Sequence, residues 1–186
     1  PELRVRSIPF PIIAQIGSDE REDYSYLESD LLFTGVLTDH RVRMCRFLQK
    51  EKFSVSYPPR LVSRRRRDII NRASKIILNI PQRKGWHWLS AMRIIAGLRC
   101  GRAAVSLGTA DNSQVAKCCD QIDLNRDDWC ASLKGYISNW RTYYLESICA
   151  YSRMATDFES MHQFPHDAFD LWAVTDRLTI DTGDGS

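Results

Sequence analysis

The sequence lacks long apolar runs and has little glycine or proline. Among its 186 residues glycine occurs nine times and proline seven times, so neither a collagen-like nor a low-complexity disordered chain fits this composition. The best candidate for a membrane-spanning segment is interrupted by Arg93 and Arg99. The sequence also shows no secretory signal, which would be a charged start followed by an apolar core. We therefore expect an intracellular protein, cytoplasmic or nuclear, that is neither secreted nor transmembrane.

The motifs of common enzymes and metal sites are also missing. The chain has no phosphate-binding glycine loop, nucleophile elbow, zinc-protease helix or paired-cysteine ribbon. His162 and His166 have the spacing of zinc-finger histidines, but Cys118 and Cys119 are adjacent, whereas a finger separates its two cysteines. The sequence therefore predicts no metal, no cofactor and no catalytic residue.

The cysteines do not indicate a disulfide framework. Most of them fall at apolar positions of predicted helices, in a chain long enough to build a core without covalent cross-links. Reduced, buried thiols are the interpretation that we favour for all six, which are Cys45, Cys100, Cys118, Cys119, Cys130 and Cys149.

The middle of the chain lacks acidic residues. Residues 41–102 hold seventeen basic and two acidic side chains, whereas residues 1–40 hold three and eight, and residues 103–186 hold six and thirteen. The net charge of +3 therefore conceals a basic middle between two acidic ends. This asymmetry indicates an anionic partner or electrostatic self-association. The alternative is that folding brings the three blocks together and neutralises them.

The densest basic cluster opens the stretch "SRRRRDIINRASKIILNI", residues 63–80. At about 100° per residue its apolar side chains share one arc, which predicts an amphipathic helix with a basic outer face and Arg66 alone toward the buried side. Exposed helix faces usually mix charges of both signs, but here only Asp68 offsets the run. We therefore predict an anion-binding or nucleic-acid-binding site made of Arg64, Arg65, Arg66, Arg67, Arg72 and Lys75, with Arg83 and Lys84 from the next segment.

Two further helices are predicted on either side of this cluster. Thr38 is placed to cap the first. In this helix Val42, Cys45, Phe47 and Leu48 are expected to face inward, and Arg41, Arg43 and Arg46 are expected to stay in water. From residue 86 to residue 107 the apolar residues surround the helical wheel, which predicts a central buried helix. Trp86 and Trp88 at its start could stack unpaired bases, but we favour a place in the core for both.

An aromatic stripe follows the cysteine-rich segment. Apolar side chains recur at helical spacing over residues 127–161, so that they would share one face of a helix. This pattern predicts one long helix, or two helices with a kink near Ser152. Such a stripe is typical of a core or a subunit interface. We predict an interaction surface on its far half and on the proline-containing N-terminal arm, made of Tyr151, Met154, Phe158, Phe10 and Ile12.

The sequence as a whole predicts an all-α fold. We expect an irregular bundle of about six helices around residues 86–107, with an extended arm at 1–17, one helical domain at 18–180 and a flexible acidic tail at 181–186. The favoured function is a non-catalytic binding and assembly protein that forms homo-oligomers. Its basic middle, residues 41–102, would engage nucleic acid or an anionic membrane surface, a charge pattern analogous to that of viral matrix and nucleocapsid proteins.

Two other classes of function stay open. One is an adaptor that holds a protein partner through the arm and the aromatic stripe, its basic face being incidental or a nuclear import signal. The other is an enzyme of unrecognised type.

Overall fold

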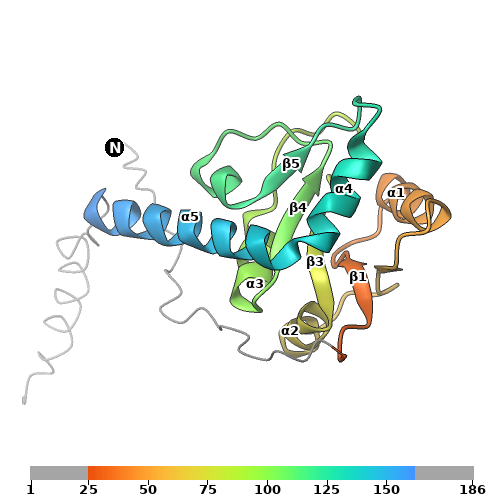
Figure 1. The fold of residues 1–186 in the computed structure, drawn as a ribbon, viewed down its shortest axis with the longest axis horizontal. Helices are drawn as coiled ribbons and strands as arrows, with labels where there is room; N and C mark the ends of the chain where they lie inside the picture. Colours follow the sequence, from red (N-terminus) through yellow and green to blue (C-terminus); the bar gives the residue numbers. More distant parts are fainter. Residues whose placement is uncertain (1–24, 162–186) are drawn as a thin grey trace, which may run out of the picture. The chain divides into compact units, whose positions relative to one another are not determined.

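A parallel β-sheet lies at the centre of the computed structural model, where the sequence predicted only helices (Figure 1). The structure describes residues 25–161, with side chains as far as residue 156. All five strands run parallel in the order β2-β1-β3-β4-β5. Their bounds are β1 Ser29–Leu32, β2 Val55–Ser56, β3 Ser74–Asn79, β4 Ala103–Leu107 and β5 Asp120–Ile122. The all-α prediction is therefore wrong, and the fold is α/β.

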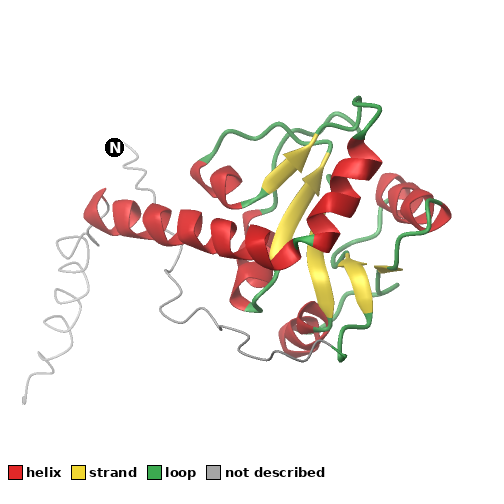
Figure 2. Cartoon of the chain, viewed as in Figure 1, coloured by secondary structure: helices red, strands yellow, loops and turns green. Residues whose placement is uncertain are grey.

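Helical segments alternate with the strands along the chain (Figure 2). They are α1 Asp39–Lys50, α2 Arg64–Arg72, α3 Ala91–Arg99, the 3₁₀ helix η1 Gln114–Cys118, α4 Trp129–Ser138 and α5 Trp140–Met161. The predicted cap of α1 is confirmed, because the Thr38 hydroxyl accepts a hydrogen bond from the Arg41 amide. Within residues 25–161, no helix combines the length and the apolar character needed to cross a bilayer.

The contacts divide the chain into two units. The first is residues 13–154, which contain the whole sheet, and the second is residues 1–12 together with residues 155–186. Of the second unit, only the C-terminal end of α5 belongs to the described residues. The predicted arm at 1–17 and tail at 181–186 lie outside them and stay predictions.

Two of the predicted helices are each a short helix followed by a buried strand. In residues 63–80, α2 ends at Arg72, Ala73 is its C-cap and β3 begins at Ser74. In residues 86–107, α3 leads through a turn at Gly101, whose φ is 75°, into β4. Parallel strands covered on both faces are apolar on both, so in sequence they resemble a helix that is apolar all round. A short apolar run does not distinguish the two by periodicity alone.

Alternate residues of the strands face two helical layers. On one face, Leu31, Ile76, Leu78, Val105 and Leu107 form a buried cluster with Cys45 and Leu48 of α1 and Leu133 of α4. On the other face, Ile77 lies against Gly97 of α3. This period of two follows from the pleat of the strands.

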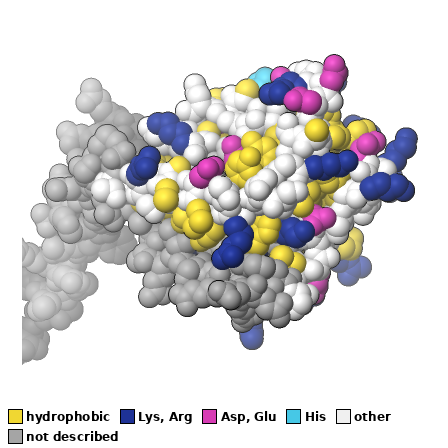
Figure 3. All heavy atoms as spheres, in the orientation of Figure 1, with side chains coloured by type: hydrophobic (Ala, Val, Ile, Leu, Met, Phe, Trp, Pro, Cys, Tyr) yellow, Lys and Arg dark blue, Asp and Glu magenta, His cyan; other side chains and the backbone are white. Residues whose placement is uncertain are grey.

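The aromatic helix breaks earlier than predicted. Asn139 is the C-cap of α4 and α5 begins at Trp140, so the single element predicted for residues 127–161 is two helices divided well before Ser152. Hydrophobic side chains gather on the face near α4 and the start of α5 in Figure 3. Trp129, Tyr136 and Ile137 of α4 are partly buried and pack against the buried cluster. The first half of the stripe is therefore core.

Two glycines test how tightly α3 and α4 are packed. A Cβ on Gly97 would lie 3.0 Å from the Ile77 side chain, whereas a Cβ on Gly135 would meet nothing within 4 Å. We expect Gly97→Val to lower the free energy of unfolding by about 1–3 kcal/mol through overpacking. Gly135→Ala is expected to raise it by up to about 1 kcal/mol through helix propensity. Urea titration measures both, and equal effects would contradict the packing.

The six thiols differ in accessibility. All are free; Cys45, Cys100, Cys118 and Cys119 are buried and Cys149 is exposed, which confirms burial for most of them. Burial raises the pKa of Cys45 and of Cys118 to about 11.

We therefore expect iodoacetamide at about pH 8 to modify Cys149 in the native protein and to leave Cys45 and Cys118 unmodified, because the thiolate is the reacting form. Peptide mass spectrometry reads the sites, and labelling of all six in urea is the control. Native labelling of Cys45 or Cys118 at the rate of Cys149 would contradict the fold.

Candidate functional site

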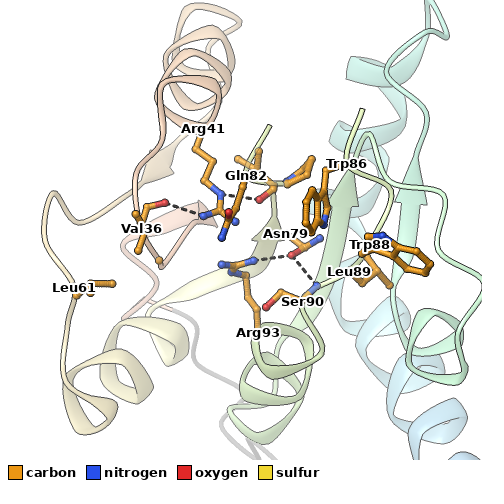
Figure 4. Close-up of a pocket in the computed structure, with 13 residues that line it drawn as sticks. Val36, Arg41, Leu61, Asn79, Gln82, Trp86, Trp88, Leu89, Ser90 and Arg93 are labelled. Carbon is orange, nitrogen blue, oxygen red and sulfur yellow. Dashed lines mark hydrogen bonds between the residues drawn. The ribbon is translucent and has the colours of Figure 1, made fainter. Parts of the chain in front are cut away.

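The strand order contains one reversal, between β1 and β3. The chain leaves β1 toward β2 on one side, while β4 and β5 extend the sheet beyond β3 on the other. In open parallel sheets the crevice outside the carboxyl ends of such neighbouring strands is the usual place for a ligand. A cavity of about 420 Å³ lies there, lined by residues from the connections that follow β1, β2 and β3 and from the start of α3 (Figure 4).

Arg41 of α1 and Arg93 of α3 point toward each other across this cavity (Figure 4). Arg41 donates to the Ile80 carbonyl through Nε and to the Val36 carbonyl through Nη1, both at 2.9 Å. Arg93 donates through Nε to the Thr34 carbonyl at 3.0 Å and through Nη1 to Asn79 Oδ1 at 2.6 Å. These neutral acceptors position the two guanidinium groups without neutralising their charge.

Aromatic contacts also support the two arginines. The guanidinium carbons of Arg41 and Arg93 lie 5.1 and 4.8 Å from the ring centroid of Phe33, which follows β1 and is fully buried. A cation over an aromatic face is attracted by the ring quadrupole. The buried ring therefore favours positive charge at this edge of the sheet.

A third arginine lies beside this pair. Arg67 of α2 lines an adjoining hollow of about 150 Å³, to which Arg93 also contributes, and its buried Nε has no hydrogen-bond partner. Burial, together with the nearby charges of Arg41 and Arg67, lowers the pKa of Arg93 to about 10, so this group is still charged at neutral pH. Among residues 25–161, none of the three is paired with a carboxylate.

Three neighbouring guanidinium groups without a paired carboxylate lower the stability of the folded protein. Burying like charges without a counter-charge destabilises a protein, and an anionic ligand would remove that cost. An anion placed among the three guanidinium groups would therefore be stabilised.

Strand register builds a row of polar side chains behind the arginines. Asn79 pairs with Ser106, and Ser106 pairs with Gln121. Asn79 Nδ2 donates to Ser106 Oγ at 2.7 Å, and the Thr109 hydroxyl joins Ser106 and Gln121 at 2.7 and 2.8 Å. This network directs Asn79 Oδ1 toward Arg93 and the Ser90 amide.

The connection between β3 and α3 carries two exposed tryptophans. Trp86 is 38% exposed and Trp88 63%, so their predicted place in the core is wrong. The Arg83 guanidinium lies 5.1 Å from the Trp86 ring. In Figure 4 Trp86 stands beside Asn79 and the cavity, whereas Trp88 points away from Arg41 and Arg93.

Gly35 lines the cavity and lies close to the Arg93 side chain. Its φ is 144°, a conformation that favours glycine. A Cβ here would lie 2.8 Å from Arg93 Nη2. A side chain at this position would therefore displace the guanidinium.

The predicted anion-binding residues do not form one cluster. Six of them lie in the first turn of α2 or in the connection after β3, at the carboxyl edge: Arg64, Arg65, Arg66, Arg67, Arg83 and Lys84. Arg72 and Lys75 lie at the opposite end of α2 and β3, where Lys75 pairs with Asp30 at 2.7 Å. Arg66, predicted to point inward, is exposed, and Arg67 is the partly buried one.

Sequence reasoning missed Arg41 and Arg93. Arg41 was assigned to water, but it is 6% exposed, whereas Phe47, expected to face inward on the same helix, is 41% exposed. A signal was available, because Arg41, Cys45 and Leu48 share one face of α1 at helical spacing and all are buried. For Arg93 the signal was that it is the one basic residue between Ser90 and Leu98, within the segment predicted to be a buried helix.

The predicted interaction surface falls at the limit of the described chain. Tyr151 is buried and Met154 partly buried, both in α5. Phe158 lies where side chains are not described, and Phe10 and Ile12 lie outside residues 25–161. Self-association through these residues stays a prediction.

The sequence matches no protein-family model and no curated protein. In the part of the chain that the structure describes, no group of three His, Cys, Asp or Glu residues is placed to hold a metal, and His162 and His166 lie outside it. Function is therefore inferred from the geometry of the cavity.

Asp111 is expected to order the connection that carries the tryptophans. Its carboxylate accepts from the Leu89 amide at 2.8 Å and the Ser113 amide at 2.7 Å. Partial burial acts to raise the pKa of Asp111, but these hydrogen bonds outweigh it and hold the pKa below its ordinary value.

We expect Asp111→Ala to speed amide exchange at Leu89 and Ser113 about tenfold, the loss of roughly 1.4 kcal/mol of protection. Hydrogen–deuterium exchange with peptide mass spectrometry measures this. Asp123→Ala is the control, because the Asp123 carboxylate accepts hydrogen bonds from the exposed Asn125 in a different connection. Unchanged exchange at Leu89 in Asp111→Ala would show that the connection is held by other contacts.

Proposed function

We propose that the cavity between the ends of β1 and β3 binds a nucleotide. The observation that carries this proposal is the convergence of Arg41, Arg67 and Arg93 without a carboxylate. Guanidinium groups match phosphate oxygens in geometry as well as in charge. A phosphate group is therefore proposed to bind at Arg93, which lines the larger cavity together with Arg41 and the adjoining hollow together with Arg67.

The start of α3 supports the same placement. Arg93 lies in the first turn of α3, and the side chain of Ser90, the N-cap residue, makes no capping hydrogen bond. The N-terminal end of a helix carries partial positive charge and favours an anion. Helix and arginine thus favour negative charge at one place.

Trp86 supplies a surface for the base. Its indole lies at the cavity wall beside Asn79 (Figure 4), and base–indole stacking is a common way to hold a nucleotide ring. The exposed Gln82 also lines the cavity, and its amide group can serve as a partner for a polar ring edge. About 420 Å³ is within the usual range for a small-molecule site.

The proposal is one of binding, with no covalent step. The residues that line the cavity include no aspartate, glutamate, histidine or cysteine, the side chains that most often act as acids, bases or nucleophiles. A non-catalytic binding protein was also the class that the sequence favoured. The ligand proposed from the geometry is smaller than the nucleic acid expected there.

Isothermal titration calorimetry with nucleoside mono- and diphosphates tests the proposal. We expect Arg93→Ala to weaken binding by about 10- to 100-fold, since charge-assisted hydrogen bonds contribute roughly 1.5–3 kcal/mol. Gly35→Ala is expected to weaken it as well, by displacing Arg93. Arg126→Ala is the matched control, because Arg126 is an exposed arginine paired with Asp128 at 2.7 Å.

Inorganic pyrophosphate and Trp86→Ala separate the two parts of the ligand. If Trp86 stacks on the base, Trp86→Ala weakens nucleotide binding and leaves pyrophosphate binding unchanged. Binding of no nucleotide by the wild type, or equal affinities for the wild type and Arg93→Ala, would contradict the proposed site.

A further inference from the structure

Exposed apolar side chains gather at the carboxyl edge of the sheet. Eight large hydrophobic residues are exposed in the described part of the chain, and five lie in the connections after β1, β2 and β3 or at the start of α3. They are Val36 (56% exposed), Leu61 (72%), Trp86 (38%), Trp88 (63%) and Met92 (55%). Exposed apolar side chains scattered singly are ordinary, but a group of this kind indicates an interaction surface.

These five residues, called the rim below, line two adjoining hollows. Val36, Leu61, Trp86 and Trp88 line the larger cavity, and Leu61 and Met92 line the adjoining hollow. The two hollows share Gly35, Leu61, Ser90 and Arg93. The rim therefore lines the same two hollows as Arg41, Arg67 and Arg93.

Basic side chains are interleaved with this rim. The connections at residues 33–41, 57–67 and 80–93 together contain nine basic residues and one acidic residue, Asp39. Six of the nine are exposed: Arg60, Arg64, Arg65, Arg66, Arg83 and Lys84. The edge thus presents tryptophan and aliphatic side chains among unbalanced positive charges.

We propose that this edge docks on an anionic lipid bilayer. Tryptophan is favoured at the level of the lipid headgroups, aliphatic side chains enter the acyl boundary, and arginine and lysine are attracted to anionic headgroups. Single-stranded nucleic acid would use the tryptophans and the charges, but it offers no apolar phase for Val36, Leu61 and Met92. The aliphatic part of the rim decides for the membrane.

The two tryptophans have different roles in this arrangement. Trp86 stands at the cavity wall, whereas Trp88 points away from Arg41 and Arg93 (Figure 4). Trp88 and Leu61, the two most exposed members of the rim, enter the headgroup layer. Docking does not require an occupied nucleotide site, so the two proposals can fail separately.

Co-sedimentation of the full chain with vesicles tests the docking. Vesicles of phosphatidylcholine mixed with phosphatidylserine are expected to bind the protein at low salt. Vesicles of phosphatidylcholine alone are expected to bind much less, and added salt should release the protein because it screens exposed charges. A blue shift of tryptophan fluorescence that is lost in Trp88→Phe would place Trp88 in the lipid.

Matched variants distinguish binding through the rim from non-specific hydrophobic or electrostatic adsorption to the vesicles. Leu61→Ser combined with Trp88→Ser is expected to lower partitioning by about tenfold or more, as apolar insertion is lost. Leu145→Ser in α5, where Leu145 is 59% exposed, is expected to bind as the wild type does. Among the charges, replacing Arg64, Arg65 and Arg66 by alanine should reduce binding, whereas replacing Arg46, Lys50 and Lys52 by alanine should reduce it less.

Several results would overturn the docking proposal. One is no binding to phosphatidylserine vesicles at low salt; another is an equal loss in Leu145→Ser. Binding to single-stranded RNA but not to vesicles would assign the edge to nucleic acid. If the Leu61 and Trp88 double variant does not fold, as judged by circular dichroism, the exposed arginine triple variant decides. Nucleotide binding is measured by calorimetry in the absence of vesicles, so its result does not depend on whether the protein binds membranes.

Discussion

The common direction of the five strands is the constraint on which the candidate site depends. In a parallel sheet, every connection from a strand to the following helix begins at the same edge. Residues 33–41, 57–67 and 80–93 are such connections, and they meet at the carboxyl edge although they are far apart in sequence. The parallel arrangement therefore brings basic residues of the middle of the chain together at this edge, because most of the positive charge near the cavity comes from these three segments.

Register adds a second level of order. Asn79, Ser106 and Gln121 are polar residues near the ends of buried strands, where an unpaired polar group is costly. Pairing places them side by side across β3, β4 and β5, and each is satisfied by its neighbours or by Thr109. The network then holds Arg93 through Asn79 at 2.6 Å. Polar residues inside the sheet thus position a charge at its edge.

The charge asymmetry is not removed within the described part of the chain. Lys75 and Asp30 form an ion pair that joins the basic middle to an acidic end, as neutralisation by folding requires. Arg41 and Arg93, however, bond to carbonyl and amide oxygens. Neutral acceptors hold a guanidinium group in place without neutralising its positive charge, so that the charge can attract an anionic ligand. Both proposals depend on positive charge that is not neutralised at this edge.

Local order was accessible from the sequence where the signal was itself local. Thr38 was predicted to cap α1 and does so, because an N-cap involves residues within one turn. Burial of most cysteines and the basic middle follow in the same way from residue type and spacing. For the aromatic stripe the spacing left core and subunit interface open, and the structure places its first half in the core.

Tertiary structure decided the identity of β3 and β4 and the roles of Arg41 and Arg93. A buried parallel strand is stabilised by pairing with strands distant in sequence and by helices on both faces, so its own residues show no alternation to distinguish it from a helix. Arg41 likewise lies on the inner face of α1 because its partners, the carbonyls of Val36 and Ile80, are brought together by the sheet. The sequence by itself determined which residues are apolar and where charge accumulates, whereas non-local pairing determined which of those charges converge on one cavity.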